Sequence, residues 1–323
     1  MAGIRIAGTG SCLASREVTS RVLERKIRVE AGWIESRTGI RTRYFCAAGE
    51  KNADLAVKAS QKAIEAAGLE PKDLDLVIAS TLSPDRHFPG IGVDVQARLR
   101  CGRIPAIDLN SQCSGFVFGL SAAAAYLASG QCRRVLLVAS EAQSPYLEFS
   151  NRQKDLCILF GDGAGAVVLE KAPKGEAPFF EMHSDGNFAL DLCLERPVRT
   201  ARSKKHVPNQ PAMNKTSVIV HSSRSVTEVI ESILKTAGLG LDAVDWLIPH
   251  QSNLNLLKEI SRRTGFPMSR IVINIDRVGN TSSASIPIAL DEAVRAGRVR
   301  RGQRVLLVSF GAGYSWGAAL FAF

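Results

Sequence analysis

Three reactive side chains stand directly after short apolar stretches of the sequence. Cys113 follows "PAIDLN", His250 ends "DWLIPH", and Asn280 lies in the turn "VGNTSSAS". A thiol can attack a carbonyl carbon, an imidazole can move a proton or donate a hydrogen bond, and an amide donates a hydrogen bond without titrating. These residue types predict a cysteine nucleophile with two supporting side chains, provided that the fold brings them together.

Cys113 stands where an apolar strand gives way to an alanine-rich helix, predicted over 114–128. The N-terminus of a helix presents free N–H groups and a positive dipole, which favour thiolate over thiol. The seven cysteines are odd in number, scattered and without a C-x-x-C pair. We therefore expect no disulfide framework and no metal site, and we expect Cys113 to be the reactive thiol.

The two halves of the sequence repeat one another. Residues 66–81 (AAGLEPKDLDLVIAST) resemble 236–251 (TAGLGLDAVDWLIPHQ), and 133–141 (RRVLLVASE) resemble 303–311 (QRVLLVSFG) at the same offset. The cysteine turn parallels the asparagine turn once a shift of two residues is allowed. Several matches in one order predict a duplicated fold, in which both turns approach one central cleft.

Each half alternates amphipathic helices with short apolar strands, as expected of buried parallel sheets. This alternation predicts an α/β architecture with right-handed crossovers, in which two sheets stack between layers of helices. We place the boundary between the halves after residue 171, so that 1–171 holds the cysteine and 172–323 holds the histidine and asparagine. Functional groups then belong at the carboxyl ends of the strands.

The composition is that of an ordinary globular protein, with 323 residues, 46% apolar, 22% charged and 6% aromatic. The formal net charge of +10 favours acidic partners. The basic residues are spread along the chain without an aromatic-interleaved patch, so we expect no nucleic-acid partner. No secretory leader or membrane-spanning stretch is evident, and we expect a cytoplasmic protein without membrane contacts.

The order Cys, His, Asn is also that of the papain-like cysteine proteases. Those enzymes carry a characteristic sequence around the cysteine, near the mature N-terminus, together with a secretory signal and disulfides. The sequence has none of these features, and the internal duplication does not belong to the papain fold. Peptide hydrolysis is therefore not favoured.

Six stretches resemble the thiolase-fold condensing enzymes, and most closely the 3-oxoacyl-[acyl-carrier-protein] synthase III family. In order, they are "WIESRTGIRTRY", "DLNSQCSGFVFGLS", "ILFGDGAGAVVLE", "DWLIPHQSNLNLL", "DRVGNTSSASIPIALDEA" and "VLLVSFGAGYSWGAAL". The resemblance runs from residue 4 to 323 and implies a thiolase-like fold of two stacked halves in α-β-α-β-α layers. A thiolase would carry a second cysteine at "FGAG", and the elongating synthases use two histidines where this chain has His250 and Asn280.

The resemblance implies a decarboxylating Claisen condensation that initiates type II fatty-acid synthesis. Cys113 would take an acyl group from an acyl-CoA. His250 and Asn280 would then stabilise the enolate that forms when malonyl-acyl-carrier protein loses carbon dioxide. The backbone amides of Cys113 and Ala312 would form the oxyanion hole, and Phe310 would pack beside the departing carboxylate. No cofactor is implied beyond these substrates.

The same resemblance assigns the CoA contacts. Trp33 would stack on the CoA adenine and Arg37 would meet a CoA phosphate. Lys154 stands where an adenine-stacking arginine is usual, and a lysine neutralises phosphate but does not stack as a guanidinium does. Phe160 is implied as a further substrate contact.

Macromolecular partners are implied as well. Phe88 would reach into the acyl pocket of a second copy, which implies a homodimer, and Arg262 and Arg263 would hold an acidic acyl-carrier protein. Asn255 replaces a usual arginine of the carrier-binding helix.

Two other departures concern the substrate pocket. Gln143 stands where an apolar pocket residue is common, and 213–223 (MNKTSVIVHSS) differs from the usual pantetheine-side wall. These departures leave the primer open, and with it the alternative of a condensing enzyme of secondary metabolism, of the quinolone type or with another acyl-CoA primer. An enzyme that only transfers acyl groups and a non-catalytic carrier-binding relative also remain.

Overall fold

Two sheets organise the chain in the computed structural model, which describes residues 3–172, 177–194 and 211–323. The first has the strand order β1-β7-β6-β4-β5 and the second the order β11-β12-β13-β8. The strands of the first sheet are β1 (Ile4–Leu13), β4 (Leu76–Ser80), β5 (Ala106–Leu109), β6 (Arg134–Glu141) and β7 (Gly163–Lys171). Those of the second are β8 (Phe179–Ser184), β11 (Trp246–Pro249), β12 (Arg304–Gly311) and β13 (Ser315–Ala322).

The apolar stretches of the sequence form the parallel strands of these sheets, as predicted. β4 pairs in parallel with both β5 and β6, and β11 pairs in parallel with β12. Every residue of β4 is buried, which explains why its first four residues are all apolar rather than alternating with polar ones. The closing strands β7 and β13 run antiparallel to β6 and β12.

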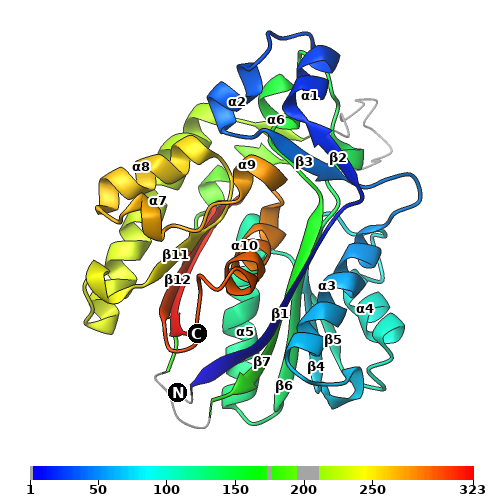
Figure 1. Cartoon of the computed structure of the whole chain (residues 1–323), viewed down its shortest axis with the longest axis vertical. Helices are drawn as coiled ribbons and strands as arrows, with labels where there is room; N and C mark the ends of the chain where they lie inside the picture. The colour runs from blue at the N-terminus through cyan, green and yellow to red at the C-terminus, as the bar shows by residue number, and fades with distance from the viewer. Residues whose placement is uncertain (1–2, 173–176, 195–210) are drawn as a thin grey trace.

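Helices form three layers around and between the two sheets (Figure 1). α5 (Gly115–Ala128) and α10 (Ser285–Arg295) lie between the sheets and share one apolar core with both. α3 (Asn52–Ala66) and α4 (Ile91–Leu99) cover the outer face of the first sheet, and α7 (Lys215–Ala237) and α8 (Leu254–Thr264) cover that of the second. The predicted α-β-α-β-α layering is confirmed.

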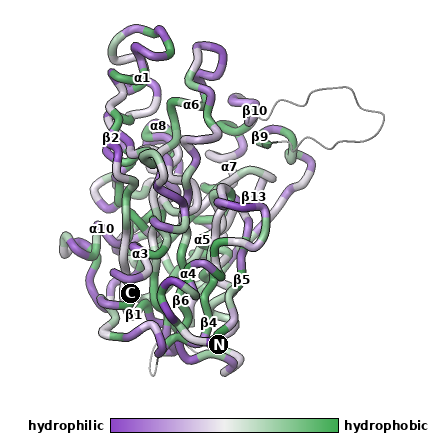
Figure 2. The backbone as a smooth tube through the Cα atoms, turned by 90° about the vertical axis from the view of Figure 1, so that its right-hand side faces the viewer, coloured by the Kyte–Doolittle hydropathy of each residue, from purple (hydrophilic) through white to green (hydrophobic). Residues whose placement is uncertain are grey.

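Smaller elements surround the upper end of the sheets (Figures 1 and 2). They are β2 (Arg16–Thr19), α1 (Ser20–Ile27), α2 (Trp33–Thr38), β3 (Thr42–Phe45), α6 (Lys154–Cys157), β9 (Leu192–Cys193), β10 (Ala212–Met213) and α9 (Ile275–Val278). Short 3-10 turns precede the two central helices: η2 (Gln112–Ser114) leads into α5, and η7 (Ser282–Ala284) leads into α10. Figure 2 shows hydrophobic colour in the interior strands and helices and hydrophilic colour on many of the outer loops.

The structure corrects one detail of the predicted repeat. η2 and η7 begin at Gln112 and Ser282, which keep the offset of the other repeats, and both residues adopt a left-handed backbone, with φ of 45° and 50°. No shift of two residues is needed at these turns. The similarity of "AIDL" to "NIDR" is misleading, because the first is strand β5 and the second enters helix α9.

Each large sheet draws its strands from one side of the predicted boundary. Strands within 4–171 form the first sheet, and strands within 179–322 form the second. The boundary after residue 171 itself stays a prediction. In the described part of the chain, no helix is long and apolar enough to cross a membrane.

Candidate active site

Cys113 lies in the turn η2, at the junction of β5 and α5. Its side chain is buried, and its Sγ is 3.3 Å from Oγ of Ser282, which belongs to the turn η7 of the other half. α5 begins only at Gly115, so the thiol precedes the helix rather than belonging to its first turn. The nucleophile predicted from the sequence therefore faces the asparagine turn, as the duplication predicts.

The predicted thiolate is wrong for the protein without substrate. Burial raises the pKa of the Cys113 thiol to about 12, and the nearby Glu141 also favours the protonated form. A helix N-terminus stabilises an anion by about 0.3–1 kcal/mol, whereas a rise from 9.0 to about 12 corresponds to about 4 kcal/mol. Removal of the thiol from water outweighs the dipole, and Cys113 is a neutral thiol at pH 7.

His250 directly follows β11, where its backbone N–H donates to the Val308 carbonyl at 2.8 Å. Its Nδ1 lies 2.7 Å from Oγ of Ser285, the first residue of α10. Burial lowers the pKa of His250 to about 4, so the imidazole is neutral at pH 7. A neutral imidazole offers one N–H donor and one acceptor nitrogen.

Asn280 is held from both sides by backbone hydrogen bonds. Its N–H donates to the Leu159 carbonyl and its own carbonyl accepts the Gly161 N–H, both at 2.9 Å, so that Phe160 lies beside it. The Oδ1 atom accepts the Ser282 N–H at 2.8 Å. Because the oxygen is engaged, Nδ2 is the group left to donate.

The segment 280–285 brings the three predicted residues together. It contains Asn280, contacts Cys113 through Ser282 and contacts His250 through Ser285. One short segment of the second half thus fixes a thiol, a neutral imidazole and an amide donor, all buried.

The end of β12 packs against the cysteine turn. A Cβ atom at Gly311 would lie 2.9 Å from the Cys113 backbone nitrogen, closer than a side chain allows. Ser114 Oγ donates to the Ser315 carbonyl at 2.9 Å and ties the two turns together. Ala312 follows Gly311 and is partly exposed, whereas Phe310 is buried against Tyr314 with ring centroids 4.9 Å apart.

Trp33 lies half-buried at the start of α2 with two cations beside it. The Arg37 guanidinium is 4.3 Å from the indole centroid and Lys154 Nζ is 5.6 Å away. Asn255, one of the departures noted in the sequence, donates from Nδ2 to the Arg37 carbonyl at 3.0 Å and so joins α8 to the end of α2. The three residues predicted to contact CoA through its adenine and phosphates therefore form one cluster.

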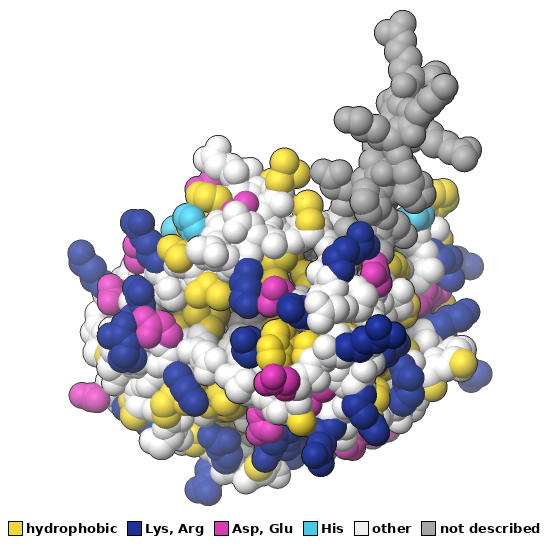
Figure 3. Space-filling model, turned by 90° about the horizontal axis from the view of Figure 1, so that it is seen from above, with side chains coloured by type: hydrophobic (Ala, Val, Ile, Leu, Met, Phe, Trp, Pro, Cys, Tyr) yellow, Lys and Arg dark blue, Asp and Glu magenta, His cyan; other side chains and the backbone are white. Residues whose placement is uncertain are grey.

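The residues predicted to meet macromolecules lie on the surface. Phe88 is 85% exposed in the segment between β4 and α4. Arg262 and Arg263 are exposed near the end of α8, and both bond to Glu259. Figure 3 shows Lys and Arg side chains spread over the face it displays, interspersed with Asp and Glu rather than gathered in one patch.

The other predicted departures have distinct surroundings. Gln143 is buried just after β6, and its Nε2 has no hydrogen-bond partner in the described structure. The stretch 213–223 ends β10 and opens α7, where Ile219 and Val220 are more than half exposed.

Sequence reasoning missed four residues of the site: Ser282, Ser285, Gly311 and Glu141. The run of small hydroxyl residues after Asn280 was the available signal, because consecutive serines at a helix start are unusual in a buried position. Glu141 gave no signal in the sequence, since its partners come from distant segments.

Family models match two segments of the chain: "3-Oxoacyl-[acyl-carrier-protein (ACP)] synthase III" over residues 107–186 and its "C terminal" counterpart over residues 234–323. The chain is 42% identical over 316 residues to the beta-ketoacyl-[acyl-carrier-protein] synthase III of Methylococcus capsulatus, covering 98% of each chain. The chain belongs to the 3-oxoacyl-[acyl-carrier-protein] synthase III family. The protein is a ketosynthase, an acyltransferase of fatty-acid biosynthesis.

Solved structures agree with this family and with the thiolase fold. The synthase III of Thermus thermophilus superposes with a TM-score of 0.92 at 35% identity, covering 98% of each chain. A priming beta-ketosynthase from a polyketide biosynthetic pathway superposes with a TM-score of 0.90 at 33% identity, covering 99% of this chain and 96% of its own. Since enzymes from both kinds of pathway share the fold, the acyl primer must be argued from the site.

Proposed function

We propose that the protein condenses an acyl-CoA primer with malonyl-acyl-carrier protein through an acyl-Cys113 intermediate, and so initiates type II fatty-acid synthesis. The observation that carries this proposal is the segment 280–285, which contacts or contains all three reactive side chains. The family's name supports a carrier-protein substrate.

The first half-reaction transfers the acyl group to sulfur. Cys113 is a neutral thiol before substrate binds, so its proton must leave as the sulfur attacks the thioester carbonyl. This proton ends on the CoA thiolate that leaves, so the step needs no change in the protonation of His250, which stays neutral. The amides of Cys113 and Ala312 hold the oxyanion of the tetrahedral intermediate.

The second half-reaction forms the carbon–carbon bond. The Ser285 hydroxyl accepts the Gln251 N–H at 3.3 Å and can donate its own proton to Nδ1 of His250. In this arrangement the imidazole carries its proton on Nε2. This Nε2–H and the Nδ2–H of Asn280 donate to the malonyl thioester carbonyl. The bond between the malonyl α-carbon and its carboxylate breaks, and carbon dioxide leaves beside Phe310. The electron pair of that bond forms the enolate. The enolate carbon then attacks the acyl carbon and releases the Cys113 sulfur as a thiolate, which takes a proton from water to become the neutral thiol again.

The acyl-CoA enters past the cluster that α2 and Lys154 of α6 form. Trp33 offers a ring face for the adenine, and Arg37 and Lys154 offer cations for the CoA phosphates. Phe160 lines the site next to Asn280. The reaction as proposed needs no metal or resident cofactor.

An acidic acyl-carrier protein is the second substrate, and the formal net charge of +10 favours its approach. Arg262 and Arg263 are exposed for such a contact, although Glu259 partly neutralises them. We infer a homodimer in which Phe88 contacts the partner copy, working in the cytoplasm.

Intact-mass spectrometry after incubation with single acyl-CoAs tests the proposal. The unaltered protein should gain the mass of an acetyl group from acetyl-CoA, and Cys113→Ala should gain none. Cys101→Ala, another buried cysteine, is the matched control and should be acylated normally. If only a longer or aromatic acyl group is loaded, that group and not acetyl is the primer. If no acyl-CoA gives an adduct, priming by acyl-CoA is refuted.

A further inference from the structure

A carboxyl group that the proposed reaction does not use lies buried beside the nucleophile. Glu141, the last residue of β6, is fully buried, and its charge acts on the Cys113 thiol. Buried carboxylates are rare unless several donors stabilise them, so the partners of Glu141 indicate what it does.

One carboxylate oxygen accepts hydrogen bonds from the loop that follows β4. Glu141 Oε2 accepts the Leu82 N–H at 3.2 Å, the Ser83 hydroxyl at 2.6 Å and the Thr81 hydroxyl at 3.3 Å. The Ser83 oxygen already accepts the Ala142 N–H at 2.9 Å, which leaves its proton for Glu141. Oε2 is therefore purely an acceptor, held by the first half of the fold.

The other oxygen reaches across to the second half. Glu141 Oε1 lies 2.5 Å from Oγ of Ser283, in the middle of the turn η7. Ser282, the neighbour of Ser283 in the chain, contacts the Cys113 sulfur at 3.3 Å, and its N–H holds the Asn280 amide at 2.8 Å. A single carboxyl thus joins the carboxyl ends of β4 and β6 to the turn that orients both reactive groups.

We propose that Glu141 is a positioning residue: through Ser283 it holds the turn Ser282–Ala284 against Cys113 and so aligns Ser282 and Asn280 for the reaction. The catalytic effect of this alignment rests on the proposed function, whereas the contacts of Glu141 are observed independently of it. Ionised carboxylates form hydrogen bonds that are shorter and about twice as strong as neutral ones, which suits a group that must fix a turn.

Glu141→Gln tests the proposal with little change in shape. The amide oxygen can still accept from the loop after β4, but the bond to Ser283 loses its charge. We expect acetyl transfer from acetyl-CoA to Cys113 to slow about tenfold, since a charge-assisted bond becomes a neutral one.

Alkylation of Cys113 by iodoacetamide, followed by peptide mass mapping, should change in the opposite direction. Two groups act on the thiol: the negative charge of Glu141 raises the pKa of Cys113, and the Ser282 hydroxyl lowers it. Burial raises the pKa of Glu141 itself, and the hydrogen bonds that its two oxygens accept act in the opposite direction. Without that charge more thiolate forms, and we expect alkylation about tenfold faster at each pH between 7 and 9. A purely structural role would not raise one rate while lowering the other.

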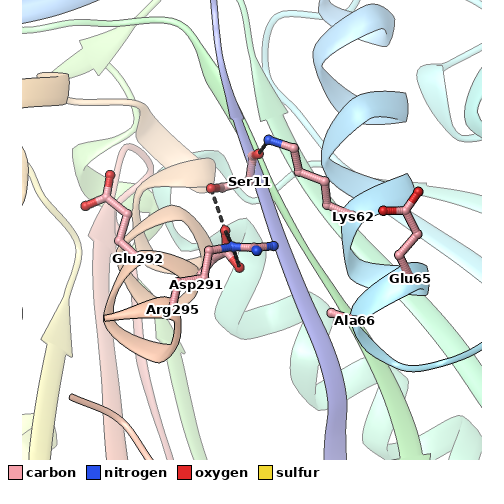
Figure 4. Close-up of a pocket in the computed structure, with 7 residues that line it drawn as sticks. All are labelled: Ser11, Lys62, Glu65, Ala66, Asp291, Glu292 and Arg295. Carbon is pink, nitrogen blue, oxygen red and sulfur yellow. Dashed lines mark hydrogen bonds and ion pairs between the residues drawn. The ribbon is translucent and has the colours of Figure 1, made fainter. Parts of the chain in front are cut away.

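Two further variants separate positioning from charge and from general stability. Ser283→Ala keeps the carboxyl group but breaks the link to the turn, so acetyl transfer should fall without faster alkylation. Asp291→Asn is the matched control. Asp291 is a buried carboxylate on α10 that accepts the Ser11 hydroxyl at 2.6 Å, beside a cavity of about 540 Å³ between α3 and α10 (Figure 4).

The outcomes decide between the proposals. If Glu141→Gln shows the same rates of acetyl transfer and of alkylation as Asp291→Asn, Glu141 has no positioning role. Normal acetyl transfer in Ser283→Ala would overturn the path through Ser283. If the unaltered protein accepts no acyl group from acetyl-CoA, the proposed priming fails, while the alkylation rates still test the contact of Glu141 with the thiol centre.

Discussion

At the scale of single residues, the three proposed reactive groups are uncharged. Burial keeps Cys113 protonated and His250 neutral, so the resting site holds neither a thiolate nor an imidazolium. A cysteine–histidine ion pair of the protease type would require opposite shifts. A neutral imidazole with its proton on Nε2 can donate a hydrogen bond from Nε2 to a thioester carbonyl.

The depressed pKa of His250 predicts a loss of stability in acid. Its pKa is about 4 in the folded protein and about 6.5 in the unfolded chain, so between these values the unfolded chain binds the proton and folding loses free energy as the pH falls. At pH 5 this amounts to about 2 kcal/mol relative to pH 7. Urea unfolding at both pH values should therefore show a smaller difference for His250→Gln than for the unaltered protein.

Other groups titrate equally in both proteins, so the comparison isolates His250. An identical pH dependence in the variant and the unaltered protein would contradict a buried, neutral imidazole.

At the scale of elements, the sequence predicted the features that depend on residues close together in the chain. The apolar stretches, their offset and the turns after them were enough to predict parallel strands, five layers and two turns meeting at one place. They did not predict Glu141 or Ser285, because each acts through contacts between segments that are distant in the chain. The ionisation state of Cys113 could not be predicted either. A helix start in the sequence indicates a favourable dipole, but the burial that raises the thiol pKa depends on the whole fold.

The close approach of β12 to the cysteine turn predicts a strict requirement for glycine at position 311. An added Cβ would meet the Cys113 nitrogen at 2.9 Å and its Cβ at 3.1 Å, and backbone atoms yield little. Gly311→Ala should displace the amides proposed to hold the oxyanion and lower acetyl transfer about 100-fold. Single-turnover acylation measured by mass spectrometry gives the rate.

Gly240→Ala is the matched control, because nothing lies within 4 Å of a Cβ built there. Acylation by Gly311→Ala at the unaltered rate would show that the loop accommodates a methyl group and that the amides are not closely placed.

At the scale of the whole molecule, the duplication explains why the site lies at the interface of the halves. The first half supplies Cys113 and Glu141, and the second supplies His250, Asn280 and the serines that contact both. Neither half contains a complete site, so the core shared by α5 and α10 with both sheets is also what assembles the chemistry.

The same architecture leaves one feature that a single copy does not satisfy. β5 is an end strand of the first sheet, so one of its edges has no strand partner within the described residues, and Phe88 is 85% exposed. An exposed edge with an aromatic side chain nearby favours pairing with a second copy. We therefore expect sedimentation to give twice the monomer mass of 34.8 kDa.

Phe88→Ala tests this interface, because a symmetric dimer loses the side chain twice. At about 2 kcal/mol for each buried aromatic anchor, the dissociation constant should rise about 1,000-fold, measured by sedimentation over a dilution series. Leu190→Ala, which truncates another apolar side chain that is 73% exposed, should leave the dimer intact. If Phe88 also reaches the partner's acyl pocket, the Phe88→Ala dimer that remains at high concentration should be acylated by acetyl-CoA more slowly. Unchanged association and unchanged acylation would place Phe88 outside any interface.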